Sequence, residues 1–309
     1  AGITTAMRLK QAGKTVAVLE ADRVAEGVSG HTTAKLTSLH QLKYTSLINR
    51  IGRDHAKLYG ASNQAAIEQV AAIARDEHID CDFERKDAYI FATDAEMLEQ
   101  VKAEAEAAID LGLPATYVTE TSLPFAVQGA VKFSHQAQFH PRKYILSLAN
   151  KIHGDGSYVF EHSRVRTVDG ESPCRVQTQQ GATVTATDVI VTTNLPILDQ
   201  GLYFAKTFPK RSYLIGAKID PAIAPNGMFI GTGEKYRSIR TTPTDDGSTL
   251  LLMGGEGHKV GEADDTEERF ERLAADAKEY FGVESVDYYW SSQDFVSFDG
   301  LPYIGPLTP

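Results

Sequence analysis

Cysteine is scarce in this chain. Its 309 residues include two cysteines, Cys81 and Cys174, which lie far apart and form no CxxC pair. This spacing indicates neither a metal knuckle nor a disulfide framework. The nine histidines and the many carboxylates form no HExxH or similar spacing, so no metal ligand is expected. Two sparse thiols fit a reducing compartment, and we expect a cytoplasmic protein.

Long apolar runs and long basic runs are also missing. No stretch approaches the ~20 apolar residues of a membrane span. The N-terminus lacks the basic and then apolar regions of a signal peptide. The net charge is −10, from 31 basic and 41 acidic side chains, which argues against a nucleic-acid partner. We therefore expect neither a membrane nor a nucleic-acid partner. The absence of GxSxG gives no support to a nucleophilic hydrolase.

Several segments have patterns typical of regular structure. Continuous apolar runs predict buried strands at Lys14–Glu20 and Asp188–Thr193. Residues 81–92 resemble a strand pair with a turn at Lys86-Asp87. Helices are expected at 94–111, with Asp94 as N-cap, and at 264–281. Both ends of the chain resemble cut ends, because there is no initiator methionine and IGPLTP is followed by no closing element.

The opening AGITTAMRLKQAGKTVAVLEAD resembles the end of a dinucleotide-binding turn. Gly2 stands where the third glycine of G-x-G-x-x-G would be, at the start of a helical pattern. Glu20 ends the following strand, close to the spacing of about 20 residues expected for a ribose-binding acid. An acid there would repel a 2′-phosphate, which argues against NADP. The alternative for these two residues alone is a helix cap and a surface acid.

The next segment, ADRVAEGVSGHTTAKLTSLH, resembles the second FAD-binding segment of the D-amino-acid-oxidase-like (DAO) flavoproteins. Such loops use small residues to pass close to the flavin, and hydroxyl and backbone N–H groups to bind phosphate oxygens. The alternative is a mobile polar loop. The residues that match the family's small-residue run are Ser29, Gly30, Thr32, Thr33, Ala34 and Lys35.

Two later segments resemble the same family. EHSRVRTVDG and DVIVTTNLPI are similar to its middle segment, where Val165 would present its backbone to the adenine and the strand tip would lie near the dinucleotide. The alternative for Val165 is an ordinary inward-facing strand residue. FDGLPYIG is similar to the closing segment near the flavin, although a simple Asp-Gly turn would also explain it. The further cofactor-binding candidates are Thr192, Thr193, Asn194, Asp299, Gly300, Leu301 and Pro302.

The resemblance implies an α/β fold with two interleaved domains. A discontinuous, Rossmann-like FAD-binding domain would comprise residues 1–80, 141–200 and 286–309, without its N-terminal strand and C-terminal helix. An α+β substrate domain on a mostly antiparallel sheet would comprise residues 81–140 and 201–285. SGHTTAKLTSLH, AQFHPRKYILSLA and YRSIRTT resemble bacterial members fused to a C-terminal Rieske [2Fe-2S] domain. No Rieske ligand motif is present in the chain, so such a domain would lie beyond residue 309.

The resemblance predicts an FAD-dependent oxidoreductase that oxidises a C–N bond of a small amine or amino acid, with non-covalent FAD. Electrons would pass to O2 or to an iron–sulfur domain. An Arg or Tyr usually holds the substrate carboxylate, and the candidates are Arg240, Tyr213 and Arg237, each of which is otherwise an ordinary arginine or tyrosine. The alternatives are an NAD-linked dehydrogenase and a non-catalytic flavin-fold module for electron transfer or assembly.

Overall fold

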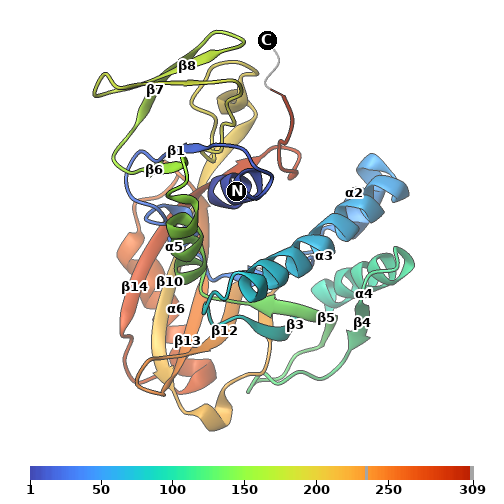
Figure 1. Cartoon of the computed structure of the whole chain (residues 1–309). Coiled ribbons are helices and arrows are strands. Elements are labelled where there is room, and N and C mark those ends of the chain that lie inside the picture. Colours follow the sequence, from blue (N-terminus) through green and yellow to red (C-terminus); the bar gives the residue numbers. More distant parts are fainter. Residues whose placement is uncertain (234–235, 307–309) are drawn as a thin grey trace. The chain divides into compact units, whose positions relative to one another are not determined.

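A computed structural model describes residues 1–233 and 236–306 (Figure 1). The chain forms two compact units, each assembled from separate segments. The first unit comprises Ala1–Thr32, Pro141–Arg211 and the residues from Gln293 onward, and the second comprises Thr33–His140 and Ser212–Ser292. Residues 33–80 thus group with the second unit, although the sequence places them in the FAD-binding domain. The domain boundaries stay a prediction.

The first unit contains a two-stranded parallel sheet, a three-stranded antiparallel sheet and two helices. Strands β1 and β6 pair with Ala17 opposite Tyr158, and β8 lies between β7 and β9. Helices α1 and α5 lie side by side (Figure 1). The elements are α1 (Gly2–Gln11), β1 (Ala17–Leu19), η1 (Val28–Gly30), α5 (Pro141–Ile152), β6 (Tyr158–Phe160), β7 (Val165–Asp169), β8 (Cys174–Thr178), β9 (Thr183–Ala186) and η2 (Tyr203–Ala205).

Two strand predictions in the first unit fare differently. The run Lys14–Glu20 does form a strand, β1, but only over Ala17–Leu19. The run Asp188–Thr193 forms no strand, and the prediction was wrong: Ile190 is 56% exposed. An apolar run becomes a strand only where a neighbouring strand pairs with its backbone, and none pairs with this run among the residues that the structure describes.

The second unit is built on a nine-stranded sheet with the order β14-β10-β13-β12-β11-β3-β5-β2, and β4 pairs with β5 at one side. β12 is antiparallel to β11 and β13, β3 is antiparallel to β5, and β11 is parallel to β3. The elements are β2 (Lys35–Leu36), α2 (Tyr44–Ile51), α3 (Arg53–Asp76), β3 (Glu84–Ala92), α4 (Ala95–Asp110), β4 (Ala115–Val118), β5 (Gly129–Gln138), β10 (Thr207–Ile219), η3 (Pro221–Ile223), β11 (Met228–Gly231), β12 (Arg237–Pro243), β13 (Thr249–Lys259), α6 (Thr266–Phe281) and β14 (Tyr288–Ser297).

The mixed α/β architecture confirms the expected fold class. Both predicted helices are present as α4 and α6, and the Asp94 carboxylate caps α4 by accepting the N–H of Met97 at 2.8 Å. The main core of the second unit lies between α6 and the sheet. Leu273, Ala277 and Phe281 of α6 are buried there with Ile215 and Ile239. Each large side chain buried in this way contributes about 1.5–3 kcal/mol.

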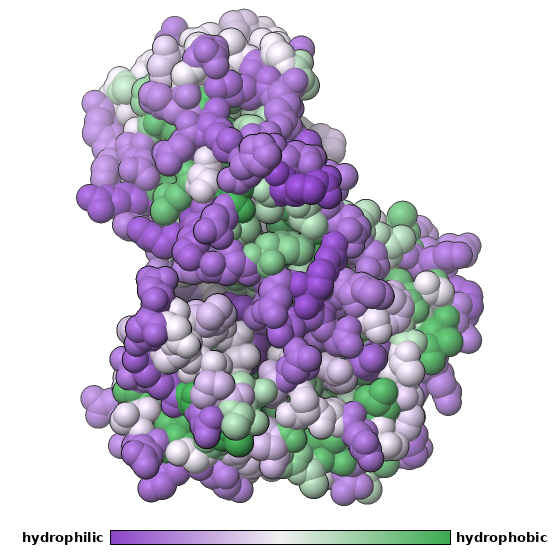
Figure 2. Space-filling model, turned by 60° about the horizontal axis from the view of Figure 1, so that its bottom comes forward, coloured by the Kyte–Doolittle hydropathy of each residue, from purple (hydrophilic) through white to green (hydrophobic). Residues whose placement is uncertain are grey.

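The face of the molecule drawn in Figure 2 is mostly polar. Figure 2 shows hydrophilic residues over most of the face in view, with hydrophobic residues in separate patches. No helix in the part of the chain that the structure describes has the length and apolar character needed to cross a membrane.

A buried carboxylate fixes the start of α2. Glu104 of α4 is fully buried. Its Oε1 accepts the backbone N–H of Tyr44 at 2.6 Å, and its Oε2 accepts the backbone N–H and the hydroxyl of Thr45 at 2.9 and 2.8 Å. The first N–H groups of a helix have no partner within the helix. Glu104 therefore supplies from another helix the cap that the residue before α2, Lys43, does not.

We predict that Glu104→Ala lowers the free energy of unfolding by about 2–3 kcal/mol, because the buried N–H of Tyr44 and the partly buried N–H and hydroxyl of Thr45 lose their acceptor. Urea denaturation followed by circular dichroism measures this. Glu106→Ala is the matched control, since Glu106 is an exposed residue of the same helix. Equal effects of the two substitutions would contradict the capping role.

Candidate functional site

The N-terminus of α1 can receive an anion. The residue before it, Ala1, makes no side-chain capping bond, and the first turn carries no acidic residue. Its N–H groups and the helix dipole therefore favour a phosphate there. A Cβ on Gly2 would lie 2.6 Å from Thr192 Oγ1, so a glycine lets residue 192 approach the end of the helix. The structure thus brings two of the predicted cofactor residues together.

Glu20 directly follows β1. Its Oε1 accepts the N–H of Asp22 at 3.0 Å, and its carbonyl oxygen accepts the N–H of Ser163 at 2.7 Å. These bonds hold the carboxylate at the carboxyl end of a parallel strand, where dinucleotide ligands collect in α/β folds. The position suits the predicted ribose contact.

The loop after β1 is tightly folded at Gly30. A Cβ at this position would lie 1.9 Å from the carbonyl oxygen of Ala25, a clash with backbone that no side-chain movement relieves. Ser29 and Thr32 are exposed on either side of it, and His31 bonds through Nδ1 to the carbonyl oxygen of Gly27 at 2.9 Å. These contacts fix a compact loop conformation, and its role toward a cofactor stays a prediction.

The remaining predicted cofactor residues of the first unit occupy separate places. Val165 begins β7, beside an irregularity in its register with β8. Thr193 Oγ1 donates to the carbonyl of Leu195 at 2.7 Å, and Asn194 Nδ2 donates to Asp294 at 2.9 Å. The described contacts give no direct link from these residues to Gly2 or Glu20.

The closing segment forms a turn held by its own side chains. The Asp299 carboxylate accepts the N–H of Leu301 at 2.9 Å, and Ser297 Oγ donates to the carbonyl of Leu301 at 2.7 Å. Gly300 has φ +69, a conformation that favours glycine, and Pro302 is exposed. This geometry explains the DGLP motif as a turn, and its role toward a flavin stays a prediction.

The first unit fits FAD on two counts. One is the N-terminus of α1 at Gly2, which has no side-chain cap. Thr192 lies so close to Gly2 that a Cβ there would collide with its hydroxyl. The other is the acidic residue at the end of β1. Gly2 and its following N–H groups would hold the pyrophosphate, and Glu20 would bind the ribose hydroxyls.

The second unit carries two neighbouring cations on one face of β12. Side chains alternate along a strand: Arg237 and Ile239 face α6, where they meet Asp276 and the core. Ser238 and Arg240 therefore point to the opposite face. There Lys35 of β2 donates through Nζ to Ser238 Oγ.

Arg240 is 5% exposed, and its Nε has no hydrogen-bond partner among the described residues. Burial lowers its pKa to about 10, although the charges of Glu84 and Asp82 act against this. A guanidinium keeps its proton at neutral pH. A buried cation with an unused donor is therefore available to an anionic ligand.

Gln138 adds a second unsatisfied group. It lies opposite Lys35 in the β2–β5 register. Its Nε2 donates to Glu84 Oε2 and to the carbonyl of Thr241, both at 3.0 Å. Its Oε1 is buried and has no partner among the described residues. Buried polar atoms are normally hydrogen-bonded. A polar ligand would therefore gain most from hydrogen bonds to Arg240 Nε and Gln138 Oε1.

Two predicted catalytic residues, Arg237 and Tyr213, lie on the side of the sheet that packs against α6. Arg237 donates through Nε to Asp276 at 2.5 Å, through Nη1 to the carbonyl of Tyr236 at 2.8 Å and through Nη2 to Glu256 at 2.8 Å. Its guanidinium is thus engaged inside the protein on the α6 side of the sheet. This geometry argues against a substrate clamp at Arg237, and we assign it a structural role.

Tyr213 is likewise part of the structure. It is 1% exposed and belongs to the core beneath α6. Its hydroxyl lies 3.0 Å from His258 Nε2 and 3.3 Å from Thr266 Oγ1, and the guanidinium of Arg269 lies over its ring. A buried ring with an engaged hydroxyl argues against the predicted contact with substrate. Arg240 remains the candidate of the three.

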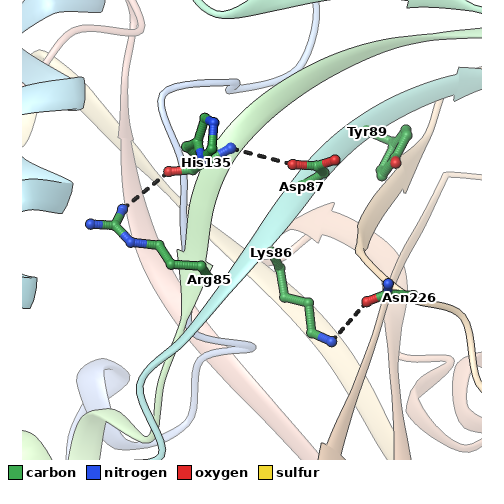
Figure 3. Close-up of a pocket in the computed structure, with 6 residues that line it drawn as sticks. All are labelled: Arg85, Lys86, Asp87, Tyr89, His135 and Asn226. Carbon is green, nitrogen blue, oxygen red and sulfur yellow. Dashed lines mark hydrogen bonds between the residues drawn. The ribbon is translucent and has the colours of Figure 1, made fainter.

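A polar hollow of about 270 Å³ opens elsewhere in the second unit (Figure 3). It is lined in part by a β-bulge in β3. The sequence predicted a turn at Lys86-Asp87, and that prediction was wrong because both residues lie within the strand. His135, with φ +58, accepts from Arg85 through its carbonyl oxygen and donates its N–H to Asp87. The charged residues that line the hollow form ion pairs with neighbouring residues, so we interpret these contacts as stabilising the bulge. The lining residues are Arg85, Lys86, Asp87, Tyr89, His135 and Asn226.

Sequence reasoning missed Ser238 and Gln138. The signal for Gln138 was present in the run SHQAQFHP, where Gln136 and Gln138 are spaced by two within a strand. Both are buried, and such polar residues on one face of a strand indicate a polar interior. Ser238 had no distinguishing signal.

We predict that Gly30→Ala destabilises the first unit and weakens FAD retention by tenfold or more, because the new Cβ collides with the Ala25 carbonyl. Thermal unfolding and FAD titration by fluorescence measure the two effects. Gly27→Ala is the matched control: it lies in the same loop, and its Cβ would meet nothing within 4 Å. Unchanged FAD affinity in Gly30→Ala would refute the loop's assigned role.

We predict that Arg237→Met lowers the free energy of unfolding by about 3–5 kcal/mol, because the buried Asp276 carboxylate loses its partner. Chemical denaturation measures this, and the double variant Arg237→Met/Asp276→Leu should recover part of the loss. A variant with wild-type stability and impaired substrate binding would instead restore Arg237 as a clamp.

Similarity to known proteins agrees with this geometry. The sequence profile of the family described as FAD dependent oxidoreductase (DAO) matches residues 1–309. The chain is 33% identical over 310 residues to the putative Rieske 2Fe-2S iron-sulfur protein YhfW of Bacillus subtilis, covering 99% of this chain and 60% of that protein. The chain therefore spans less than two thirds of that relative.

Two further proteins are more distantly similar. Gamma-glutamylputrescine oxidoreductase of Escherichia coli is 24% identical over 336 residues, covering 99% of this chain and 74% of that protein. The crystal structure of glycine oxidase from Geobacillus kaustophilus superposes with a TM-score of 0.77 at 17% identity, covering 98% of this chain and 82% of that chain. The profile match confirms the resemblance inferred from the sequence motifs. Because it extends over residues 1–309, this chain belongs to the FAD dependent oxidoreductase (DAO) family.

Proposed function

We propose that this protein oxidises a C–N bond of a small amino acid or of an amine that carries a carboxylate. The observation that supports this most directly is the Arg240 guanidinium, which is buried, cationic and left with an unused Nε. Arg240 would bind the substrate carboxylate, since a charge-assisted bond to a guanidinium is strong and directional. The names of two similar proteins, gamma-glutamylputrescine oxidoreductase and glycine oxidase, are compatible with this substrate class.

FAD would supply the oxidising chemistry by accepting a hydride from the carbon next to the substrate nitrogen. The chain's own residues would bind and orient. In this proposal Gly2, Glu20, Thr192 and the Ser29–Gly30 loop hold a non-covalent FAD. Thr32, Thr33, Ala34, Val165, Thr193, Asn194 and residues 299–302 are further candidates for cofactor contact.

The electrons would then leave to O2 or to a Rieske-type iron–sulfur domain. The name of the Bacillus subtilis relative, which is 33% identical, favours the iron–sulfur domain as acceptor. This chain covers 60% of that relative. A cytoplasmic location is part of the same proposal. The family match favours FAD over the nicotinamide-linked alternative.

The proposal predicts a flavin absorption spectrum in the purified protein and its bleaching under anaerobic conditions by at least one small amine. Glycine, sarcosine, D-alanine and γ-glutamylputrescine are suitable probes. Hydrogen peroxide formation on readmission of air would identify O2 as the acceptor. A flavin that no amine reduces would contradict the proposed reaction and favour a non-catalytic flavin module.

Arg240→Met tests the clamp. We expect the Kd of a carboxylate-bearing probe, followed by perturbation of the flavin spectrum, to rise about 30-fold or more. This corresponds to the loss of a hydrogen bond to a charged group, worth about 2–3 kcal/mol. Arg75→Met is the control, since the Arg75 side chain is 74% exposed. Equal affinity in the two variants would remove Arg240 from the binding site.

A further inference from the structure

Lys35 is a basic group that the proposed function leaves without a task. Its Nζ donates to the hydroxyl of Ser238, on the face of β12 that also carries Arg240. Among the described residues, no carboxylate forms an ion pair with it. Glu84 Oε1 is paired with Lys86 at 2.7 Å, and Glu84 Oε2 accepts the amide of Gln138. Among the described residues, the charge that acts on Lys35 is the like charge of Arg240.

This environment makes the neutral form of Lys35 accessible. Burial, followed by repulsion from Arg240, lowers the pKa of Lys35 from its usual range near 10.5 to about 7. The lowered pKa brings the unprotonated form of Lys35 within reach at neutral pH. The neutral amine has a lone pair and can accept a proton.

The oxidation of an amine needs such an acceptor. A free amino acid carries an ammonium group at neutral pH, whereas hydride can leave its carbon only when the nitrogen has a lone pair to form the new C=N bond. When Arg240 holds the carboxylate of an α-amino acid, one carbon atom separates that carboxylate from the ammonium group. The ammonium group then lies close to Arg240, which is a fixed cation, so losing its proton relieves repulsion.

We propose that Lys35 accepts the proton of the substrate's ammonium group and so delivers the substrate to the flavin as a free amine. The inference deepens the proposed function and rests on it. One N–H bond of the substrate breaks and one N–H bond forms on Lys35 Nζ. No electrons are transferred in this step, and Lys35 later returns the proton to water. Ser238 orients Nζ through its hydroxyl.

The pH dependence of flavin reduction tests this in the FAD-loaded protein. With the best probe of the amine panel, kcat/KM of the wild type should rise as pH increases through about 7, because the base works only when unprotonated. Lys35→Met should lose this inflection and fall about 100-fold at pH 7, as expected for a lost general base. Its rate should recover only toward the pKa of the free probe.

Lys35→Arg separates a base from a mere positive charge. Arginine keeps the charge but stays protonated, so the proposal expects a loss as large as in Lys35→Met. Full activity in Lys35→Arg would overturn the proposal. Lys57→Met, at an exposed position of α3, is the matched control and should leave the profile unchanged.

A second measurement needs no activity. In protein labelled with [13Cε]lysine, one resonance should titrate near pH 7, and this resonance should be missing from Lys35→Met. A spectrum in which every lysine resonance titrates above pH 9 would overturn the proposal even if a variant failed to fold.

The outcomes distinguish the two proposals. If no probe reduces the wild-type flavin, the proposed function fails, and the proton transfer fails with it. If a probe reduces the wild type and Lys35→Met keeps the inflection within threefold of the wild-type rate, only the assignment of Lys35 is overturned.

Discussion

The alternation of side chains along β12 determines which of its two arginines is paired with carboxylates inside the protein and which can bind a ligand. Arg237 and Arg240 are three residues apart, so the strand sends them to opposite faces of the same sheet. On one face Arg237 is neutralised by Glu256 and Asp276 against α6. On the other face Arg240 lies near Lys35 and keeps an unused donor. One strand thereby separates a charge that stabilises the fold from a charge that can bind a ligand.

The difference between the two arginines is energetic as well as geometric. A buried ion pair roughly offsets the cost of removing both charges from water, whereas a buried cation without a partner does not. Arg240 Nε has no hydrogen-bond partner among the described residues. The charges of Arg240 and Lys35 repel each other, although Glu84 and Asp82 act on Arg240, so an anionic ligand would stabilise the second unit. Local destabilisation of this kind is common where binding or chemistry takes place.

The sequence carried enough information for the family and the fold class, and the residues that it suggested for the cofactor site stay predictions. Gly2, Glu20 and Gly30 were recognisable because a glycine or an acid at a fixed place in a strand–turn–helix pattern has a local physical cause. The Asp94 cap was predictable for the same reason. The alternation of side chains along YRSIRTT also separates Arg237 from Arg240, because residues three apart in a strand point to opposite faces.

Long-range pairing was not predictable. Lys35 and Ser238 are 203 residues apart, and no local pattern indicates that they meet. The run DVIVTT has a strand-like composition, yet strand formation depends on a neighbour that composition does not reveal. Tyr213 resembled a binding residue because tyrosine suits both a core and a ligand site, and only the position of α6 decides between them.

The capping of α2 by Glu104 has a consequence for the order of folding. The bond joins residues 60 positions apart, so α2 cannot complete its first turn until α4 has docked beside it. Contacts between distant residues form late, because closing a long loop costs entropy before the contact compensates for it. The short helix α2 should therefore become ordered only after α4 has packed against β4 and β5, and its amide protons should be among the last to gain protection from exchange.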